Sequence, residues 1–386
     1  MSVSDMTELR LNPSRQKSPP VCPRDGKDAR SGFSLIELLI VMTMMMVLMG
    51  AAFSLMSQSL KVSTVSYELT DAQQNLRTAQ EYVNRDLTTL GDGLRGIGNI
   101  HIPTAFVTNY LTSSPINPVT NGVMSLAIVT ADNAGGTTPT GLLPGADRIS
   151  ILSADPNAPA PVSTVTYSAV VPVSLTSTGD SLRVPTASVT AANIQAGEVY
   201  FVNAGTDAAF VVIKQIVADS AAGVSQLLCG TSAGVEDYGL NRAGMVSLIT
   251  ANGTRAATIR RMQFVNYFVN SSGLLIRRNF GLRRTPGLTD AEFSARVLAG
   301  GTIAENVTSL QFRYVLDAPV HTLPAGVFVP QPVNQLTASA PPSSVRQIEV
   351  KVTTKTSHPL QNGSYQEVSA TTRNSVRNLQ FLRTLN

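Results

Sequence analysis

Apolar positions near the start of the chain form a single run from Phe33 to Met56. The only charged side chain within this run is Glu37, and the run reaches the roughly 20 residues that a helix needs to cross a bilayer. The pattern therefore predicts a membrane-spanning helix over 33–56. A carboxylate in such a helix costs on the order of 2.5–3.5 kcal/mol at mid-membrane on insertion scales, so we expect Glu37 to have a partner and a function.

After Met56 the helical pattern continues, but it becomes amphipathic. Apolar residues recur every three or four positions, with charged residues on the other faces; they are Val62, Val65, Leu69, Ala72, Leu76, Ala79, Val83, Leu87 and Leu90. This spacing predicts a second helical half over 57–90 with a narrow apolar seam that packs on a globular domain. The alternative is a bitopic anchor followed by a coiled-coil stalk.

Glycines between Gly91 and Gly98 mark the end of this helix. Gly91, Gly93 and Gly96 fit the pattern G-x-G-x-x-G, but the dinucleotide fingerprint must follow a strand and open a helix. Because these glycines follow a helix, we interpret them as a helix stop and a turn.

The remainder, 91–386, consists of short apolar or alternating runs between turn residues, which is typical of strands. The expected strands are 124–130, 148–152, 162–175, 199–202, 210–217, 246–249, 259–269, 274–280, 307–316, 345–354 and 365–372. Residues 270–273 are predicted to connect an antiparallel hairpin, and 289–298 to form a short helix capped by Thr289 or Asp290. The loops are expected at 131–145, 155–161 and 321–342. The predicted class is α+β: a long N-terminal helix, membrane-spanning in its first half, packed on a β-rich, mainly antiparallel globular head.

The residues around Glu37 resemble a known signal. A polar segment, 1–32, ends in a basic flank and Gly32, and is followed by Gly-Phe-Ser-Leu-Ile-Glu-Leu-Leu-Ile-Val over 32–41. A secretory signal has its apolar core before the cleavage site, whereas here the apolar run comes after it. The order of residues resembles the class III signal of type IV prepilins and pseudopilins.

This resemblance implies roles for three residues. Prepilin peptidase would cut after Gly32 on the cytoplasmic side and methylate the new amino group of Phe33. An amine and a carboxylate that are buried together lower each other's desolvation cost, either within one subunit or between neighbouring subunits. The resemblance favours the second, in which Glu37, residue five of the processed chain, sets the register of subunit assembly. The alternative is a glutamate that reaches the membrane surface without such a partner.

The processed chain would have a small net charge and no intrachain disulfide. Charged residues are 14% of the chain, and without 1–32 it would hold 23 Lys/Arg and 21 Asp/Glu, a net charge of +2 that gives no strong steering to nucleic acid. Cys22 lies in the predicted leader, which leaves Cys229 alone and excludes an intrachain disulfide in the processed chain. We expect Cys229 to be a small buried residue and not a reactive thiol.

No constellation of catalytic residues is apparent. The three histidines, His101, His321 and His358, share no metal-ligand spacing, and no G-x-S-x-G lies between a strand and a helix. We therefore expect no enzymatic activity, no cofactor and no metal. The pairs at 260–261, 277–278 and 283–284 are all arginine. They would form either a basic patch that contacts DNA or a solvated sheet edge, and we favour the edge because neighbouring strand residues face opposite sides.

Less specific strand patterns in the head indicate one subgroup of this family. Residues 305–314, 345–352 and 371–378 look like the paired C-terminal strands of PilW-type minor pilins, and 196–203 with 209–212 is similar to an inner hairpin of that family. The implied function is a minor pilin that takes part in pilus assembly or initiation, held in the bacterial inner membrane with its head in the periplasm and later in the filament or its tip. Its implied partners are prepilin peptidase, other major and minor pilins, the inner-membrane assembly platform and, before assembly, membrane lipid. The alternatives are a type II secretion pseudopilin of the GspJ kind and a bitopic surface-binding protein.

Overall fold

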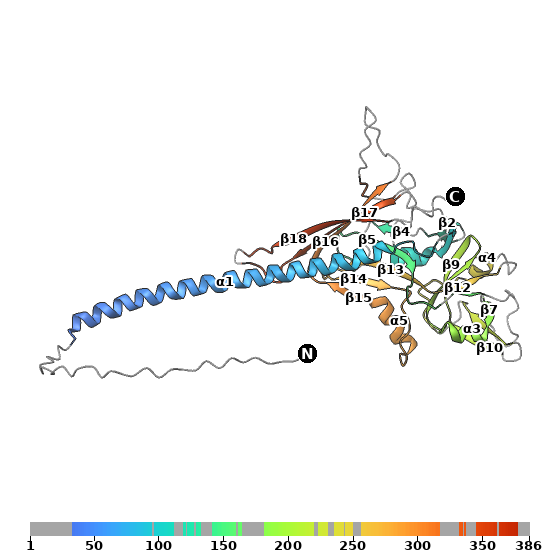
Figure 1. Ribbon diagram of the computed structural model, residues 1–386, viewed down its shortest axis with the longest axis horizontal. Coiled ribbons are helices and arrows are strands. Elements are labelled where there is room, and N and C mark those ends of the chain that lie inside the picture. The colour runs from blue at the N-terminus through green and yellow to red at the C-terminus, as the bar shows by residue number, and fades with distance from the viewer. Residues whose placement is uncertain are drawn as a thin grey trace, which may run out of the picture. The chain divides into compact units, whose positions relative to one another are not determined.

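The structure is a computed structural model of the chain (Figure 1). It describes residues 33–94, 96–111, 119–120, 122–126, 129–132, 141–159, 161–163, 181–219, 223–230, 235–242, 244–249, 256–316, 332–334, 336, 345–360 and 363–376. The chain divides into two compact units, Met1–Val62 and Ser63–Asn386.

The first element is the helix α1, Leu35–Thr88, of 54 residues. Within the second unit its predicted apolar seam is buried, at Ala72, Leu76, Ala79, Val83 and Leu87. Val65 and Leu69 are half-buried and Val62 is exposed, so close packing on the head begins one to two turns later than the sequence pattern does. The prediction of a helix that packs on the head is confirmed from that point onward.

The glycines that follow α1 end the helix, as predicted. Gly91 and Gly93 have φ angles of 77° and 72°, a region that residues with a Cβ rarely enter. The N–H of Gly91 donates to the carbonyl oxygen of Leu152 at 2.8 Å, and a Cβ on Gly93 would lie 2.9 Å from that of Ala154. The turn therefore leads the chain from the helix directly onto a strand of the head.

The described strands form four sheets, and nearly all neighbours are antiparallel. The largest sheet has the order β2-β3-β1-β9-β8-β12-β6 and one parallel pair, β1 with β9. Its strands are β1 (Asn99–Pro103), β2 (Val119–Thr120), β3 (Val123–Ser125), β6 (Val162–Ser163), β8 (Val199–Ala204), β9 (Asp207–Val212) and β12 (Thr258–Arg260). A second sheet has the order β10-β11-β7, with β7 (Ser181–Pro185), β10 (Gln215–Asp219) and β11 (Val224–Leu228).

The other two sheets lie against α1 (Figure 1). One has the order β15-β14-β13-β5-β4, with β4 (Val129–Asp132), β5 (Arg148–Ala154), β13 (Met262–Val269), β14 (Leu275–Asn279) and β15 (Gly301–Ala304). The last has the order β16-β17-β18, with β16 (Val307–Leu316), β17 (Val345–Lys355) and β18 (Glu367–Ser375). A long helix on a β-rich, mostly antiparallel head confirms the predicted class.

Several local predictions are also confirmed. β13 and β14 form an antiparallel hairpin, and its turn is closed by the Asn270 side chain, which accepts from the N–H groups of Ser272 and Leu274. The helix α5 (Asp290–Ala299) starts at a capping box formed by Thr289 and Glu292. Cys229 is buried, as expected.

Other predictions are wrong. Residues 246–249 form part of the helix α4 (Met245–Ile249) and not a strand; Met245, Val246 and Ile249 are buried, a spacing that gives one helical face, and a short apolar run does not distinguish the two structures. The predicted strands 210–217 and 259–269 are each divided between two sheets, β9 with β10 and β12 with β13. Of the predicted strand 162–175 only β6 is described. In the predicted loop 131–145, residues 131–132 belong to β4 and residues 133–140 lie outside the described residues, as does most of the predicted loop 321–342. The hydrophobic pattern did not predict the short elements α2 (Thr104–Phe106), the π-helical turn Val107–Leu111 or α3 (Thr186–Ala191).

The described residues of the head form three hydrophobic cores. The first joins α1 to β5, β13, β14, β16 and β17 through residues that include Val83, Leu87, Tyr267 and Phe312. The second lies around the rings of Phe106, Phe201, Phe210, Phe264 and Phe280. The third lies between β8, β9, α3 and α4. Because α1 supplies part of the first core, the segment from Ala72 to Leu90 belongs to the folded head.

Candidate functional site

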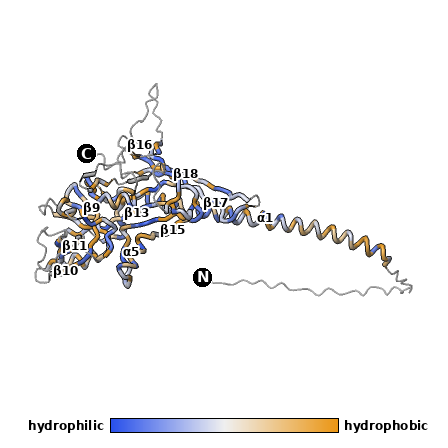
Figure 2. The backbone as a smooth tube through the Cα atoms, turned by 180° about the vertical axis from the view of Figure 1, so that it is seen from behind, coloured by the Kyte–Doolittle hydropathy of each residue, from blue (hydrophilic) through white to orange (hydrophobic). Residues whose placement is uncertain are grey.

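The N-terminal part of α1 is apolar and solvent-exposed along its whole length in the first unit. Among the described residues it is the one helix long and apolar enough to span a membrane, with a mean hydropathy of 2.3 over 18 residues and none of that window buried. Phe33 is 82% exposed, and most of the residues that follow it are hydrophobic, as the colouring of this part of the chain shows (Figure 2). Such a surface is stable only in lipid or against other apolar helices.

Glu37 occupies the first turn of this helix. The N–H of Ser34 donates to Glu37 Oε2 at 3.1 Å, and the N–H of Leu38 donates to the carbonyl oxygen of Ser34 at 3.2 Å. Ser34 is thus the N-cap and Glu37 the third helical residue, which reaches back as in half of a capping box. The carboxylate also lies where the helix dipole favours negative charge. Within one chain, Glu37 therefore already stabilises the end of the helix that the predicted cut would expose.

Of the other predicted site residues, the structure describes Phe33. Phe33 precedes Ser34 and is exposed, so its backbone is close in sequence to the carboxylate of Glu37. Gly32 and Cys22 lie outside the described residues.

The family comparison matches this same region. The profile of the prokaryotic N-terminal methylation motif matches residues 27–53, which include Gly32, Phe33 and Glu37. The chain carries a prepilin-type N-terminal methylation motif. This motif and the exposed apolar helix support a membrane-anchored, type IV pilin-like or pseudopilin-like protein that prepilin peptidase processes. No curated protein and no solved structure matches the chain.

A buried ion pair joins the C-terminal half of α1 to the head. Asp86, on the apolar seam, accepts from Tyr267 Oη and from Arg277 Nε, both at 2.7 Å. Burial and the charge of Asp86 raise the pKa of Tyr267, which keeps the phenol protonated as a donor. Although burial lowers the pKa of Arg277, Asp86 raises it on balance. Sequence reasoning missed this site, although an aspartate beside Leu87 on the seam was a signal that it needs a partner.

We expect Asp86→Ala to destabilise the head strongly. Removing one partner leaves Arg277 without its counter-charge, and breaking a buried pair costs about 3–5 kcal/mol; because the Arg277 side chain is 22% exposed, we expect the lower end of that range. Urea unfolding of the full chain in detergent measures the change. The matched control is Glu81→Ala on the exposed face of the same helix, and an equal loss in both variants would contradict the assignment.

A second polar contact joins α1 to the head, closer to the apolar N-terminal half of the helix. Glu68 Oε2 accepts from the N–H groups of Ser357 and His358 at 3.0 and 3.1 Å, and Glu68 Oε1 contacts His358 Nδ1 at 2.8 Å. Both groups of His358, the ring first and then the N–H, hold the pKa of Glu68 below its ordinary value against the opposing effect of burial. The turn between β17 and β18 is thereby tied to the helix.

Acid is expected to release this contact. A glutamate with a lowered folded pKa contributes stability above its unfolded pKa, about 4.3, and this contribution is lost as the pH falls through the lower folded value. Urea unfolding midpoints between pH 7 and pH 3 should therefore fall more for the wild-type chain than for Glu68→Gln. Parallel pH profiles for the two proteins would show that Glu68 contributes nothing.

The histidines and arginines that the sequence singled out do not form a site. His101 contacts Asp207 at 3.1 Å, His358 contacts Glu68, and His321 lies outside the described residues. Within the described ranges no group of three or more His, Cys, Asp or Glu residues is placed to hold a metal ion. Each histidine of the described part thus has its own carboxylate, in a different region of the head.

The arginine pairs form neither a basic patch nor a solvated edge, because most of them are engaged inside the head. Arg260 lies over the ring of Phe201, 5.2 Å from its centroid, whereas Arg261 is buried 3.8 Å from Glu198. Arg278 donates to the carbonyl oxygen of Leu298, and Arg284 pairs with Asp290. Of the six arginines only Arg283 is exposed. Both alternatives for these pairs are therefore wrong.

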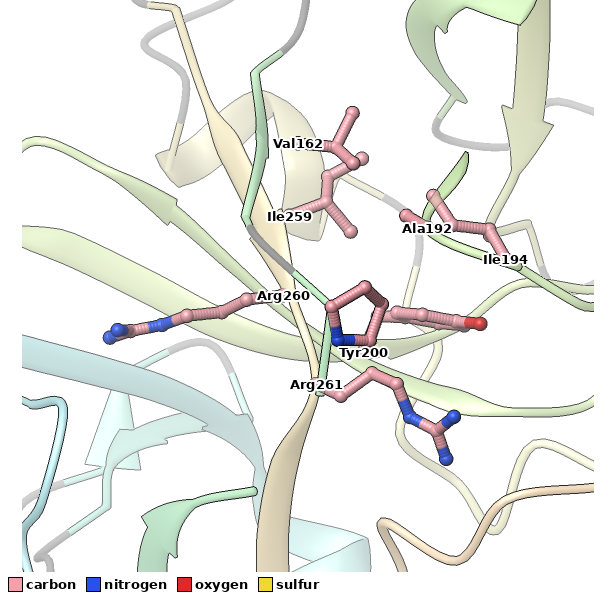
Figure 3. Close-up of a pocket in the computed structure, with 8 residues that line it drawn as sticks. Val162, Ala192, Ile194, Tyr200, Ile259, Arg260 and Arg261 are labelled. Atoms are coloured by element: carbon pink, nitrogen blue, oxygen red, sulfur yellow. The ribbon is translucent and has the colours of Figure 1, made fainter. Parts of the chain in front are cut away.

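Arg260 and Arg261 also border a small hollow between β12, β6 and α3. Figure 3 shows their side chains pointing to different sides of it. The other lining residues are Pro159, Val162, Ala192, Ile194, Tyr200 and Ile259. The Tyr200 hydroxyl donates to the buried Glu198 at 2.6 Å, whereas Arg260 Nε is buried without a hydrogen-bond partner. With about 10 Å³ of room, the hollow is large enough for one water molecule at most and is not a ligand site.

Proposed function

We propose that this chain is a minor pilin of a type IV pilus, of the PilW type. Prepilin peptidase would cut between Gly32 and Phe33 and methylate Phe33. The observation that carries the proposal is the methylation motif at 27–53 on a helix of membrane-spanning length and composition. The role is structural and not enzymatic.

The proposed assembly step uses Glu37. Before assembly the apolar part of α1 lies in the inner membrane, with the head in the periplasm. In the filament, apolar contact with other pilin helices replaces contact with lipid, so the exchange is close to neutral in free energy. The amine of Phe33 in one subunit and the carboxylate of Glu37 in its neighbour would neutralise each other. Glu37 would then exchange its contact with the Ser34 N–H for a charged partner.

The size of the head supports a low-copy role. The second compact unit runs from Ser63 to Asn386 and contains three hydrophobic cores, which is large for a subunit that repeats along a filament shaft. We propose that the chain initiates the pilus or lies at its tip. Equal abundance with the major pilin in purified filaments would contradict this.

Mass spectrometry of the N-terminal peptide tests the proposal. We expect an N-methylated Phe33 terminus both in membranes and in sheared surface filaments. The same terminus confined to membranes would favour a type II secretion pseudopilin of the GspJ kind, which carries the same signal. An intact leader in both fractions would favour the bitopic surface-binding alternative and overturn the pilin assignment.

A further inference from the structure

Among the described residues, β18 is an unusually long edge strand that has no neighbour on its outer side. The edge strands β2, β4, β6, β7, β10 and β15 have between two and five residues each, whereas β18 has nine. The opposite edge of its own sheet, β16, is long as well, but Val333 pairs with Tyr314 there. Proteins commonly keep edge strands short to prevent unwanted pairing. β18 departs from the rule that the other described edges follow.

Two backbone hydrogen bonds fix which residues of β18 present their backbone at the open edge. The N–H of Val376 donates to the carbonyl oxygen of Arg346, and the N–H of Thr356 donates to that of Gln366, both at 3.0 Å. In an antiparallel pair, residues alternate between bonding the neighbouring strand and pointing away from it. Even-numbered residues of β18 therefore bond β17. The N–H and C=O groups of the odd-numbered residues point to the open edge; these residues are Glu367, Ser369, Thr371, Arg373 and Ser375.

The edge also lacks the usual protective features. The pairing of β17 with β18 runs through nine residue pairs without a register shift, and β18 contains neither proline nor lysine. Its outward side chains are small hydroxyls except for Glu367 and for Arg373, whose Nε donates to Glu349 at 2.8 Å. Prolines, bulges and inward charges are the devices that normally block strand addition. A straight, small-residue edge of this kind is suited to β-augmentation, in which a partner adds a strand.

The direction of β18 relative to α1 excludes one kind of partner, a second copy of β18 paired antiparallel. Glu68 contacts the turn before β18, and Asn84 contacts Thr372 and Asn374 near its end. The strand therefore runs beside this part of α1 in the same direction (Figure 1), over about 24 Å of helix and about 26 Å of strand. Antiparallel pairing of two β18 edges about a two-fold axis would reverse one helix relative to the other. Two chains anchored in one membrane do not adopt that arrangement.

The charged residues around the edge indicate which kind of partner strand is complementary to it. The pairing register places Arg313, Lys351, Lys355 and Arg373 on the same outward face as Glu349 and Glu367, an excess of positive charge. A polar strand with an acidic side chain complements this face, and like charges directly opposite one another are destabilising.

We propose that the open edge of β18 accepts a strand from the head of a different prepilin-processed subunit. The assignment of the partner rests on the proposed function, because the motif at 27–53 makes other pilins the neighbours of this chain. The bond is backbone to backbone, through the odd-numbered residues from Glu367 to Ser375. Assembly of the heads would then be coupled to the parallel alignment of the α1 helices.

Photo-cross-linking in cells tests the proposal. A photoreactive amino acid is placed at Ser369 or Thr371 on the edge, and at Lys351 as the matched control, which lies opposite Thr371 on the central strand. We expect cross-links from both edge positions to a strand of another protein whose own N-terminus is processed and methylated, and none from Lys351. Equal cross-linking from Lys351 would show that the partner covers the face and not the edge, and would overturn the proposal.

Proline variants distinguish the loss of strand pairing at the edge from unfolding of the head. Thr371→Pro removes an N–H that points to the open edge, whereas Thr372→Pro removes one that bonds β17. We expect Thr371→Pro to keep its unfolding midpoint and to abolish the cross-link from Ser369. If that cross-link persists, or joins two copies of this chain, the proposal is wrong. The mass of the N-terminal peptide, which shows whether the chain begins at a methylated Phe33, tests the proposed function separately. A processed terminus without cross-links from the edge would overturn the proposed strand addition and leave the proposed function standing.

Discussion

Replacing Gly32 with valine is expected to leave residues 1–32 attached to the chain. The resemblance places the cut directly after this glycine, and the methylation motif spans it. A β-branched side chain beside the scissile bond would block the approach of the peptidase where glycine has no Cβ. The apolar run that follows is unchanged, so the precursor should still insert into the membrane. N-terminal peptide mass spectrometry should find no methylated Phe33.

The matched control for this variant is Ser31→Ala, one residue earlier in the same segment. It should be cut as the wild-type chain is, because the change adds no bulk. A methylated Phe33 terminus in Gly32→Val would show that the cut does not depend on this glycine, and it would undermine the assignment of the signal.

Glu37→Gln is expected to be processed normally and to be nearly absent from filaments. The amide oxygen of glutamine still accepts from the Ser34 N–H, so the start of α1 is preserved. The charge that would neutralise the amine of a neighbouring Phe33 is lost, however, and an uncompensated buried charge costs about 3–5 kcal/mol. At about tenfold per 1.4 kcal/mol, incorporation should fall at least roughly a hundredfold.

Quantifying the chain in sheared filaments relative to membranes measures this loss. Membrane levels should not fall, because removing the carboxylate lowers the cost of insertion. Glu37→Asp keeps the charge and serves as the control, with partial recovery of incorporation. A Glu37→Gln chain that enters filaments at the wild-type ratio would rule out the charge pair as the basis of register.

The features that the sequence predicted well depend on residues close together along the chain. The predicted seam repeats every three or four residues, and its six members from Ala72 to Leu90 are buried. The capping box at Thr289 and Glu292 and the turn at Asn270 are equally local. The methylation motif at 27–53 is local too, which is why a sequence profile matches it.

The features that the sequence did not predict depend on distant residues. Asp86 meets Arg277, 191 positions away, and no periodicity connects them. The runs 210–217 and 259–269 read as continuous strands because apolar content does not show where a chain leaves one sheet for another. The arginine pairs looked solvent-exposed for the same reason: their partners, such as Glu198 and Asp86, come from other elements.

The contribution of α1 to the first core has a consequence for how the chain folds. Ala72 accepts a hydrogen bond from Thr354, 282 residues later, and the seam also packs against β16 and β17. The ribosome makes α1 before these strands, so this core cannot close until β17 has been synthesised. Contacts of such long range slow folding. Until then the apolar residues of the seam have no partner, and we expect the nascent chain to depend on chaperones or on the membrane surface during that interval.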